Sequence, residues 1–159
     1  MTSRIDEFAE VASEFCAWAE GPPLPAIGEA HTAVLLLSAL YRAALHLPVQ
    51  CDDRQPSEVS RESWQDVYRR FGALPFNYYM QCLDPQSVPA EEVGVADLAD
   101  DLADIWRDLK AGLMLFNAGH VSAAVREWRQ GFWQHWGRHA AGAIFALHCW
   151  LSDHAEDAN

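Results

Sequence analysis

Basic residues are scarce in this chain of 159 residues, because Lys and Arg together number 11 against 23 Asp and Glu. Lys110 is the only lysine, and the formal net charge at pH 7 is −12. Phosphate groups are bound by clustered cations, so this balance argues against nucleic acid and against an anionic membrane surface as partners. A basic protein or a small molecule is compatible with it.

The sequence also lacks long hydrophobic runs and paired cysteines. Runs such as residues 33–37 are far too short to span a membrane. The cysteines are far apart and form no C-x-x-C pair: Cys16, Cys51, Cys82 and Cys149. Residues 1–14 hold acids and no apolar core, so we expect no signal peptide, reduced thiols and a cytoplasmic location.

Several motifs of known chemistry are absent. The chain has no G-x-S-x-G, no P-loop and no G-x-G-x-x-G, and its later helical segments lack the Glu-x-x-His of di-iron bundles. Hydrophobic residues nevertheless make up 50% of the sequence, including seven Trp and seven Phe. This is enough apolar area for one core, so we expect a single domain over residues 1–159.

Apolar residues recur at helical spacing over most of the chain. The pattern predicts helices from the Ser3 cap to Gly21 and over about residues 26–47, 57–72, 95–118 and 121–153. Between residues 73 and 90 three prolines interrupt the periodicity, which indicates an irregular connection. No strand pattern is evident. We therefore predict an all-α, five-helix, bundle-like domain, with the second helix central and the fourth and fifth helices adjacent and antiparallel.

The predicted fourth helix carries an acidic strip. At 100° per residue, Asp97, Asp101, Asp104 and Asp108 fall close together, directly beside the apolar stripe of this helix. Like charges one turn apart each cost about 0.2–0.5 kcal/mol in an exposed helix. Only Arg107 lies within one turn of the strip as a cation, so we expect the charge to be offset from another element.

The predicted fifth helix can supply that charge, because polar side chains stand within its aromatic face. Its spacing His-x-x-x-His places His135 and His139 on one side, as in metal-binding helices, and predicts a largely buried His139. The two helices together predict a polar seam, which we call the predicted seam. Its members are Asp97, Asp101, Asp104, Arg107, Asp108, Arg129, His135, Arg138 and His139.

The composition of the predicted seam leaves three interpretations open. Four aspartates on a helix are most often a solvated face; the alternatives are an interhelical ion-pair network and a metal or catalytic site. The metal candidates are Asp101, Asp104, Asp108, His135 and His139. No Glu stands between the histidines as in H-E-x-x-H, and neighbouring arginines would already neutralise the aspartates. We therefore predict no bound cofactor, although a divalent metal ion remains possible.

Two long motifs resemble a known family. Residues 95–113 read VADLADDLADIWRDLKAGL and residues 135–148 read HWGRHAAGAIFALH. Both are similar to segments of a bacterial family called domain of unknown function 5063. The chain departs from that pattern at Phe145, where an arginine is common, at Trp106 for Tyr, and at Leu83 for Phe. The resemblance implies a bacterial, cytoplasmic, all-helical domain and no particular activity.

Two functions fit these observations. The first is a non-enzymatic binding, adaptor or regulatory protein whose acidic surface engages a basic partner. The alternative is a metal-dependent hydrolase acting on a phosphorylated small molecule. The adaptor requires the acidic strip to lie on an open surface, whereas the hydrolase requires it to face a pocket.

Overall fold

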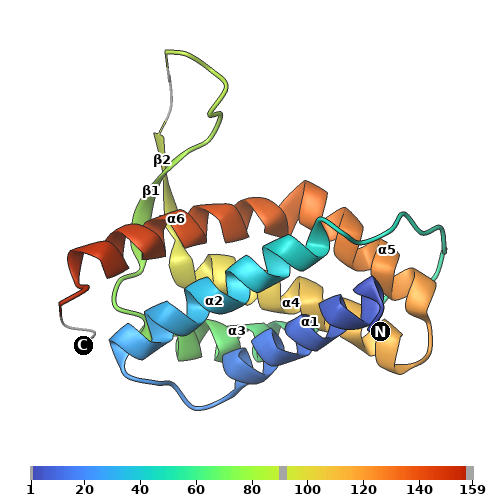
Figure 1. Cartoon of the computed structure of the whole chain (residues 1–159). Helices are drawn as coiled ribbons and strands as arrows, with labels where there is room; N and C mark the ends of the chain where they lie inside the picture. The colour runs from blue at the N-terminus through green and yellow to red at the C-terminus, as the bar shows by residue number, and fades with distance from the viewer. Residues whose placement is uncertain (1, 90–92, 157–159) are drawn as a thin grey trace.

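A computed structural model describes residues 2–89 and 93–156. Over this part of the chain it contains six α-helices and one two-stranded antiparallel sheet (Figure 1). The helices are α1 Arg4–Glu20, α2 Ala26–Ala44, α3 Arg61–Arg70, α4 Leu98–Asn117, α5 Val121–Gly131 and α6 Gly137–Asp153. The strands are β1 Tyr78–Cys82 and β2 Val93–Asp97.

The helix ends follow local capping chemistry. The predicted Ser3 cap is confirmed, since its side chain accepts a hydrogen bond from the backbone N–H of Asp6. Ser60 caps α3 in the same way, so that helix begins at Arg61 rather than near residue 57. The second helix ends at Ala44, before the predicted residue 47.

The hairpin of β1 and β2 corrects the strictly all-α prediction. Tyr78 pairs with Asp97 and Cys82 with Val93, and the ribbon projects beyond the helical body (Figure 1). Each strand has only five residues, and β2 runs directly into α4, so its residues were included in the helical periodicity. Tyr78 and Met80 are exposed, whereas Tyr79 between them is partly buried. This alternation is the period of two that marks a half-buried strand.

The central helix is α4, not α2 as predicted. It packs against α1, α3, α5 and α6, and more of its residues are buried than of any other described helix. Four residues of the predicted apolar stripe, Leu98, Leu102, Ile105 and Leu109, are completely buried, whereas the fifth, Phe116, is partly buried. On α2, by contrast, Leu35 is exposed. Surrounded by other helices, α4 can present its polar side to several of them at once.

The predicted fifth helix consists of three consecutive helical segments. A π-helical segment, Phe132–Trp136, separates α5 from α6. The predicted apolar face is exposed at Val121, but it is buried at Trp128 on α5 and at Trp136 within the π-helical segment. Each indole N–H has a backbone acceptor, Leu109 O at 3.1 Å and Trp128 O at 3.2 Å. The aromatic face thus packs without leaving these two donors unpaired.

A buried ion pair fixes α3 on the bundle. The guanidinium of Arg70 forms two hydrogen bonds to the carboxylate of Glu29, at 2.6 and 2.9 Å. Its Nε donates to the carbonyl of Gly21, and its plane lies over the ring of Trp18. Removing one partner of such a pair typically costs about 3–5 kcal/mol. This anchor holds in place the helix that carries Trp64 and Tyr68.

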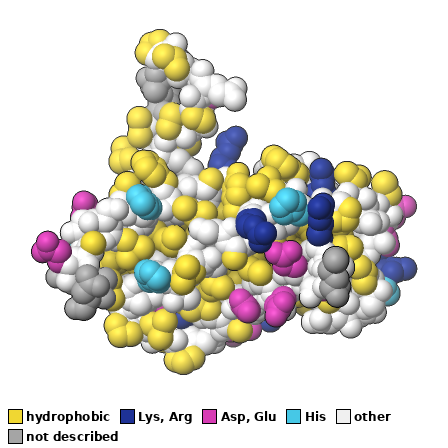
Figure 2. Space-filling model, viewed as in Figure 1, with side chains coloured by type: hydrophobic (Ala, Val, Ile, Leu, Met, Phe, Trp, Pro, Cys, Tyr) yellow, Lys and Arg dark blue, Asp and Glu magenta, His cyan; other side chains and the backbone are white. Residues whose placement is uncertain are grey.

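Exposed hydrophobic side chains are distributed unevenly. On the face shown in Figure 2 they predominate on the left half and on the projecting hairpin, whereas Lys and Arg side chains gather towards the right half. Among the described residues, no helix combines the length and the hydropathy needed to cross a membrane.

Because α4 and α5 are in close contact, adding one methyl group at Gly112 should destabilise the fold. A Cβ on Gly112 would lie 2.0 Å from Nε1 of the buried Trp128. We expect Gly112→Ala to lower the free energy of unfolding by about 1–3 kcal/mol through overpacking, measured by urea denaturation. The control is Gly72→Ala, where a Cβ meets nothing within 4 Å. Equal stability of the two variants would contradict the packing shown here.

Candidate functional site: a network of imidazoles and carboxylates

Five aspartates lie at the start of α4 and along its polar side: Asp97, Asp100, Asp101, Asp104 and Asp108. The side chains of all but Asp100 have partners among the described residues. Asp97 ends β2 and caps α4, accepting from the backbone N–H of Asp100 at 3.0 Å and from the hydroxyl of Tyr68 at 3.1 Å. This aspartate therefore has a structural role at the start of the helix.

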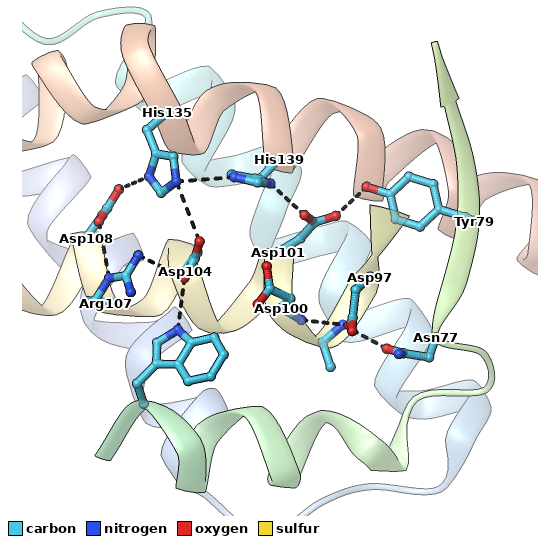
Figure 3. A network of polar contacts seen from close by, with 12 residues as sticks. Asn77, Tyr79, Asp97, Asp100, Asp101, Asp104, Arg107, Asp108, His135 and His139 are labelled. Atoms are coloured by element: carbon cyan, nitrogen blue, oxygen red, sulfur yellow. Dashed lines mark hydrogen bonds and ion pairs between the residues drawn. The ribbon is translucent and has the colours of Figure 1, made fainter. Parts of the chain in front are cut away.

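Asp101 is buried, with 4% of its surface exposed, and lies between two hydrogen-bond donors. Its Oδ1 is 2.6 Å from Nδ1 of His139, and its Oδ2 accepts a hydrogen bond from the hydroxyl of Tyr79 (Figure 3). The hydrogen bond to Asp101 raises the pKa of His139 above its usual value, although burial opposes the rise. Burial, followed by the bond to Asp101, raises the pKa of Tyr79, which therefore remains a donor.

His135 lies beside the next two aspartates along α4 and forms a hydrogen bond with one of them, Asp108. Its Nδ1 lies 2.7 Å from Oδ2 of Asp108, and its Nε2 lies 3.5 Å from Oδ2 of Asp104. The two imidazoles also meet, with 3.3 Å between the Nε2 atoms of His135 and His139. We call Asp101, Asp104, Asp108, His135 and His139 the imidazole–carboxylate network.

The hydrogen bonds of the network restrict its proton positions. A carboxylate only accepts, so Nδ1 of each imidazole carries a proton directed at Asp101 or Asp108. Neutral imidazoles then have unprotonated Nε2 atoms that face each other. Two such lone pairs at 3.3 Å require something between them, either one shared proton or a bound cation.

The second carboxylate oxygen of Asp104, Oδ1, is bound by side chains other than His135. Oδ1 accepts from the indole Nε1 of Trp64 on α3 and from Nη2 of Arg107, each at 2.9 Å. Nε of Arg107 is 4.0 Å from Asp108. Arg107 thus offsets part of the acidic charge from within α4, and in Figure 3 it lies beside Asp104 at the end of the network that Asp108 occupies.

The hairpin positions Tyr79 through its junction with α4. Asn77 precedes β1, and its backbone carbonyl accepts from the N–H of Leu98 at 2.7 Å. Its side-chain oxygen accepts from the N–H of Ala99 at 3.1 Å. Both donors belong to the first turn of α4, whose N–H groups have no acceptor within the helix. The start of α4 is therefore tied to the strand that carries Tyr79.

The π-helical segment sets the position of His135. It ends with a hydrogen bond from the N–H of Gly137 to the carbonyl of Phe132, the five-residue spacing of a π-helix. A Cβ at Gly137 would lie 2.3 Å from that oxygen, so only glycine fits this wide turn. Such turns are frequent at functional sites.

Asp100 differs from the other four aspartates. Among the described residues its carboxylate forms no hydrogen bond or ion pair, and its side chain is partly exposed. Partial burial, followed by the nearby charges of Asp104, Asp97 and Asp101, raises its pKa. It lines a pocket of about 540 Å³ beside α3 together with Glu58, Val59, Arg61, Trp64, Asp104 and Arg107.

The predicted pairing of the fourth and fifth helices is confirmed for the histidines and wrong for two arginines. Nε of Arg129 instead donates to the carbonyl of Leu47, beyond the end of α2, at 3.3 Å. Arg138 is exposed beside the hairpin and pairs with none of the described acids. The π-helical turn shifts α5 relative to α6, and Arg138 lies about 100° around the helix from His139. His139 is largely buried as predicted, with 28% of its side chain exposed.

Sequence reasoning missed the partners that come from outside these two helices. Tyr79 lies on an unpredicted strand and donates to Asp101, and Trp64 and Tyr68 on α3 donate to Asp104 and Asp97. A buried indole or phenol needs a hydrogen-bonding partner, which is the signal that could have directed Trp64 and Tyr68 towards the aspartates.

Comparison with known proteins identifies the family. The model of the family described as domain of unknown function (DUF5063) matches residues 1–153. The chain belongs to DUF5063. Its structure is similar to the crystal structure of protein BF1032 from Bacteroides fragilis, with a TM-score of 0.74 and 25% identity over 92% of this chain and 90% of that one. No curated protein matches the chain. The description of DUF5063 gives no activity, so function rests on the geometry of the site.

The contact of His139 with Asp101 predicts how the stability of the metal-free DUF5063 chain depends on pH. Because its folded-state pKa is raised above 6.5, protonated His139 stabilises the fold fully below that value. The contribution is lost as the pH rises through the folded-state pKa. We expect Asp101→Asn to lower the His139 pKa in an NMR titration and to remove this part of the pH dependence. The control is Asp53→Asn, and an unchanged His139 pKa in Asp101→Asn would contradict the pairing.

Proposed function

We propose that this chain binds one divalent transition-metal ion at the imidazole–carboxylate network. The ligands are Nε2 of His135, Nε2 of His139 and one carboxylate oxygen of Asp104. All three ligand atoms lie within 4.8 Å of one another. Two imidazoles and one carboxylate form a set used by catalytic zinc sites and by non-haem iron enzymes.

The spacing of the ligand atoms carries the proposal. Two ligands of a tetrahedral zinc ion, each about 2.0–2.1 Å from the metal, lie about 3.3–3.4 Å apart. The Nε2 atoms of His135 and His139 are separated by 3.3 Å, and His135 Nε2 lies 3.5 Å from Asp104 Oδ2. An ion between them would take up both lone pairs that face each other.

The hydrogen bonds that the two imidazoles donate from Nδ1, the nitrogen that does not bind the ion, support the same proposal. Imidazoles that bind a metal usually donate their other N–H to a carboxylate, which fixes the tautomer and the orientation of the ring. Here Nδ1 of His135 faces Asp108 and Nδ1 of His139 faces Asp101. Tyr79 in turn donates to Asp101. Each ligand imidazole is therefore already oriented.

The ligand set is open to solvent and incomplete for a structural site. Structural zinc ions usually have four protein ligands, whereas catalytic ions have three and one exchangeable position. The side chains of His135 and His139 are 39% and 28% exposed. An ion bound here can therefore exchange with solvent and retain a position for water or another small ligand.

The argument against a metal ion weakens once the arginines are located. The expectation of no cofactor depended on Arg129 and Arg138 neutralising the aspartates, and neither lies at the network. Arg107 remains, but it bonds Oδ1 of Asp104 and leaves Oδ2 for the ion. The competing arrangement is a proton shared by the two imidazoles.

An acidic docking surface for a basic partner has less support. It requires carboxylates that are open and unpaired, whereas Asp101 is buried and the side chain of Asp104 is 15% exposed. Both are already engaged by donors from other elements. Desolvating them against a partner would disrupt hydrogen bonds that the fold uses.

Calorimetric titration of the chelator-treated protein with Zn²⁺ tests the proposal. We expect one-to-one binding with a Kd in the micromolar range or tighter. His139→Ala and Asp104→Ala should each weaken binding by at least about 100-fold, because each removes a ligand rather than an outer-shell partner.

The matched control is His148→Ala, which removes an exposed imidazole from the same helix. It should leave the affinity unchanged. The proposal is wrong if wild type shows no Zn²⁺ binding, or if His139→Ala and Asp104→Ala bind as tightly as His148→Ala. Unfolding of each variant, followed by circular dichroism, separates ligand loss from loss of fold.

A further inference from the structure

We infer that the pocket beside Asp104 makes this metal site hydrolytic towards phosphate esters, with Asp100 as the proton acceptor. The inference rests on the proposed metal binding, since it uses the open position of the ion. It assigns a role to the aspartate that the network leaves free and to the pocket between α3 and α4.

The carboxylate of Asp100 has no partner among the described residues, whereas the carboxylates of the nearby aspartates do. Asp97 caps α4, Asp101 and Asp108 orient imidazoles, and Asp104 is held by Trp64 and Arg107. Within residues 2–89 and 93–156, the Asp100 carboxylate has no hydrogen-bond or ion-pair partner. A carboxylate without a partner on the wall of a pocket is free to accept a proton during a reaction.

The position of Asp100 brings it within reach of the ion. Asp100 and Asp104 are one turn apart on α4, a spacing that places their Cβ atoms about 5–6 Å from each other. Both line the same pocket of about 540 Å³. Figure 3 shows the two carboxylates in succession along α4, with His135 and His139 above them on the next helix. Asp104 joins the pocket to the proposed ion, because it lines the pocket and its Oδ2 lies 3.5 Å from Nε2 of His135. A water molecule at an open position on the pocket side of the ion would be the one that Asp100 can reach.

The walls of the pocket indicate the substrate class. Two arginines, Arg61 and Arg107, line it beside the apolar surfaces of Trp64 and Val59. Glu58 and the two aspartates complete the lining. Arg61 forms no ion pair among the described residues, so its guanidinium is available to an anionic group beside the attacked atom, whereas Arg107 also holds Oδ1 of Asp104. Guanidinium groups bind phosphate oxygens well, and a phosphate ester matches this arrangement.

The reaction balances with water as the only co-reactant. Asp100 accepts a proton from the water while the water oxygen forms a bond to phosphorus. The bond from phosphorus to the ester oxygen breaks, and the departing oxygen takes the proton from Asp100. The products are an alcohol and inorganic phosphate, and Asp100 returns to its carboxylate form.

Hydrolysis of p-nitrophenyl phosphate by the Zn²⁺-loaded protein tests the inference. We expect turnover by wild type and a kcat about 100-fold lower in Asp100→Asn, with KM and Zn²⁺ affinity little changed. The control is Glu62→Gln, which neutralises an exposed acid on α3 that lies outside the pocket. Turnover by Asp100→Asn equal to that of Glu62→Gln would overturn the role of Asp100.

A second pair of variants tests the anion site. Arg61→Met should raise KM and weaken competitive inhibition by inorganic phosphate about 10-fold, without changing Zn²⁺ affinity. Arg69→Met, in the exposed ion pair with Asp66, should change neither. Wild type that binds Zn²⁺ but neither hydrolyses the ester nor binds phosphate overturns the hydrolytic inference alone. Wild type that binds no Zn²⁺ overturns the proposed function as well.

Discussion

Electrostatic repulsion along the polar side of α4 is the constraint on which the arrangement of the site depends. Adjacent turns of one helix carry carboxylates, and that of Asp101 is buried where water screens its charge little. The fold supplies hydrogen-bond donors to these carboxylates from four other elements. Imidazoles come from the π-helical segment and α6, a phenol comes from β1, and an indole comes from α3. A hydrogen bond to a carboxylate fixes the position of each of these imidazole, phenol and indole side chains.

The same constraint explains why α4 lies in the middle of the bundle. Its apolar stripe must be covered, and its acidic strip must meet donors, so neighbours are required on both sides. The ion pair of Arg70 with Glu29 holds α3 in place, and Asn77 ties the hairpin to the first turn of α4. Features remote from the network therefore determine its geometry. The pocket beside Asp104 arises where α3 leaves part of the strip uncovered.

The sequence predicted the positions of those residues that helical periodicity determines, and it failed for the others. The buried faces of α4, α5 and α6 and the meeting of histidines with aspartates followed from spacing alone. Arg129 was misplaced because periodicity assumes a regular helix, and the π-helical turn at residues 132–136 changes the register between α5 and α6. Arg138 is adjacent to His139 in α6 and therefore points about 100° away from it around the helix. Tyr79 could not be found because its strand, β1, has only five residues and its partner strand, β2, continues directly into α4. The pairing of Trp64 with Asp104 depends on how two helices pack, which no local pattern encodes.

For a member of DUF5063, the network provides a chemical hypothesis where the family description gives no activity. The account stands on the claim that the space between the two Nε2 atoms holds a metal ion. Anomalous X-ray diffraction above the zinc edge, from crystals grown with equimolar Zn²⁺, tests this most directly. The account predicts one strong peak about 2.0–2.2 Å from Nε2 of His135, Nε2 of His139 and a carboxylate oxygen of Asp104. Zinc bound elsewhere, or a direct hydrogen bond still joining the two imidazoles with no peak between them, would contradict it.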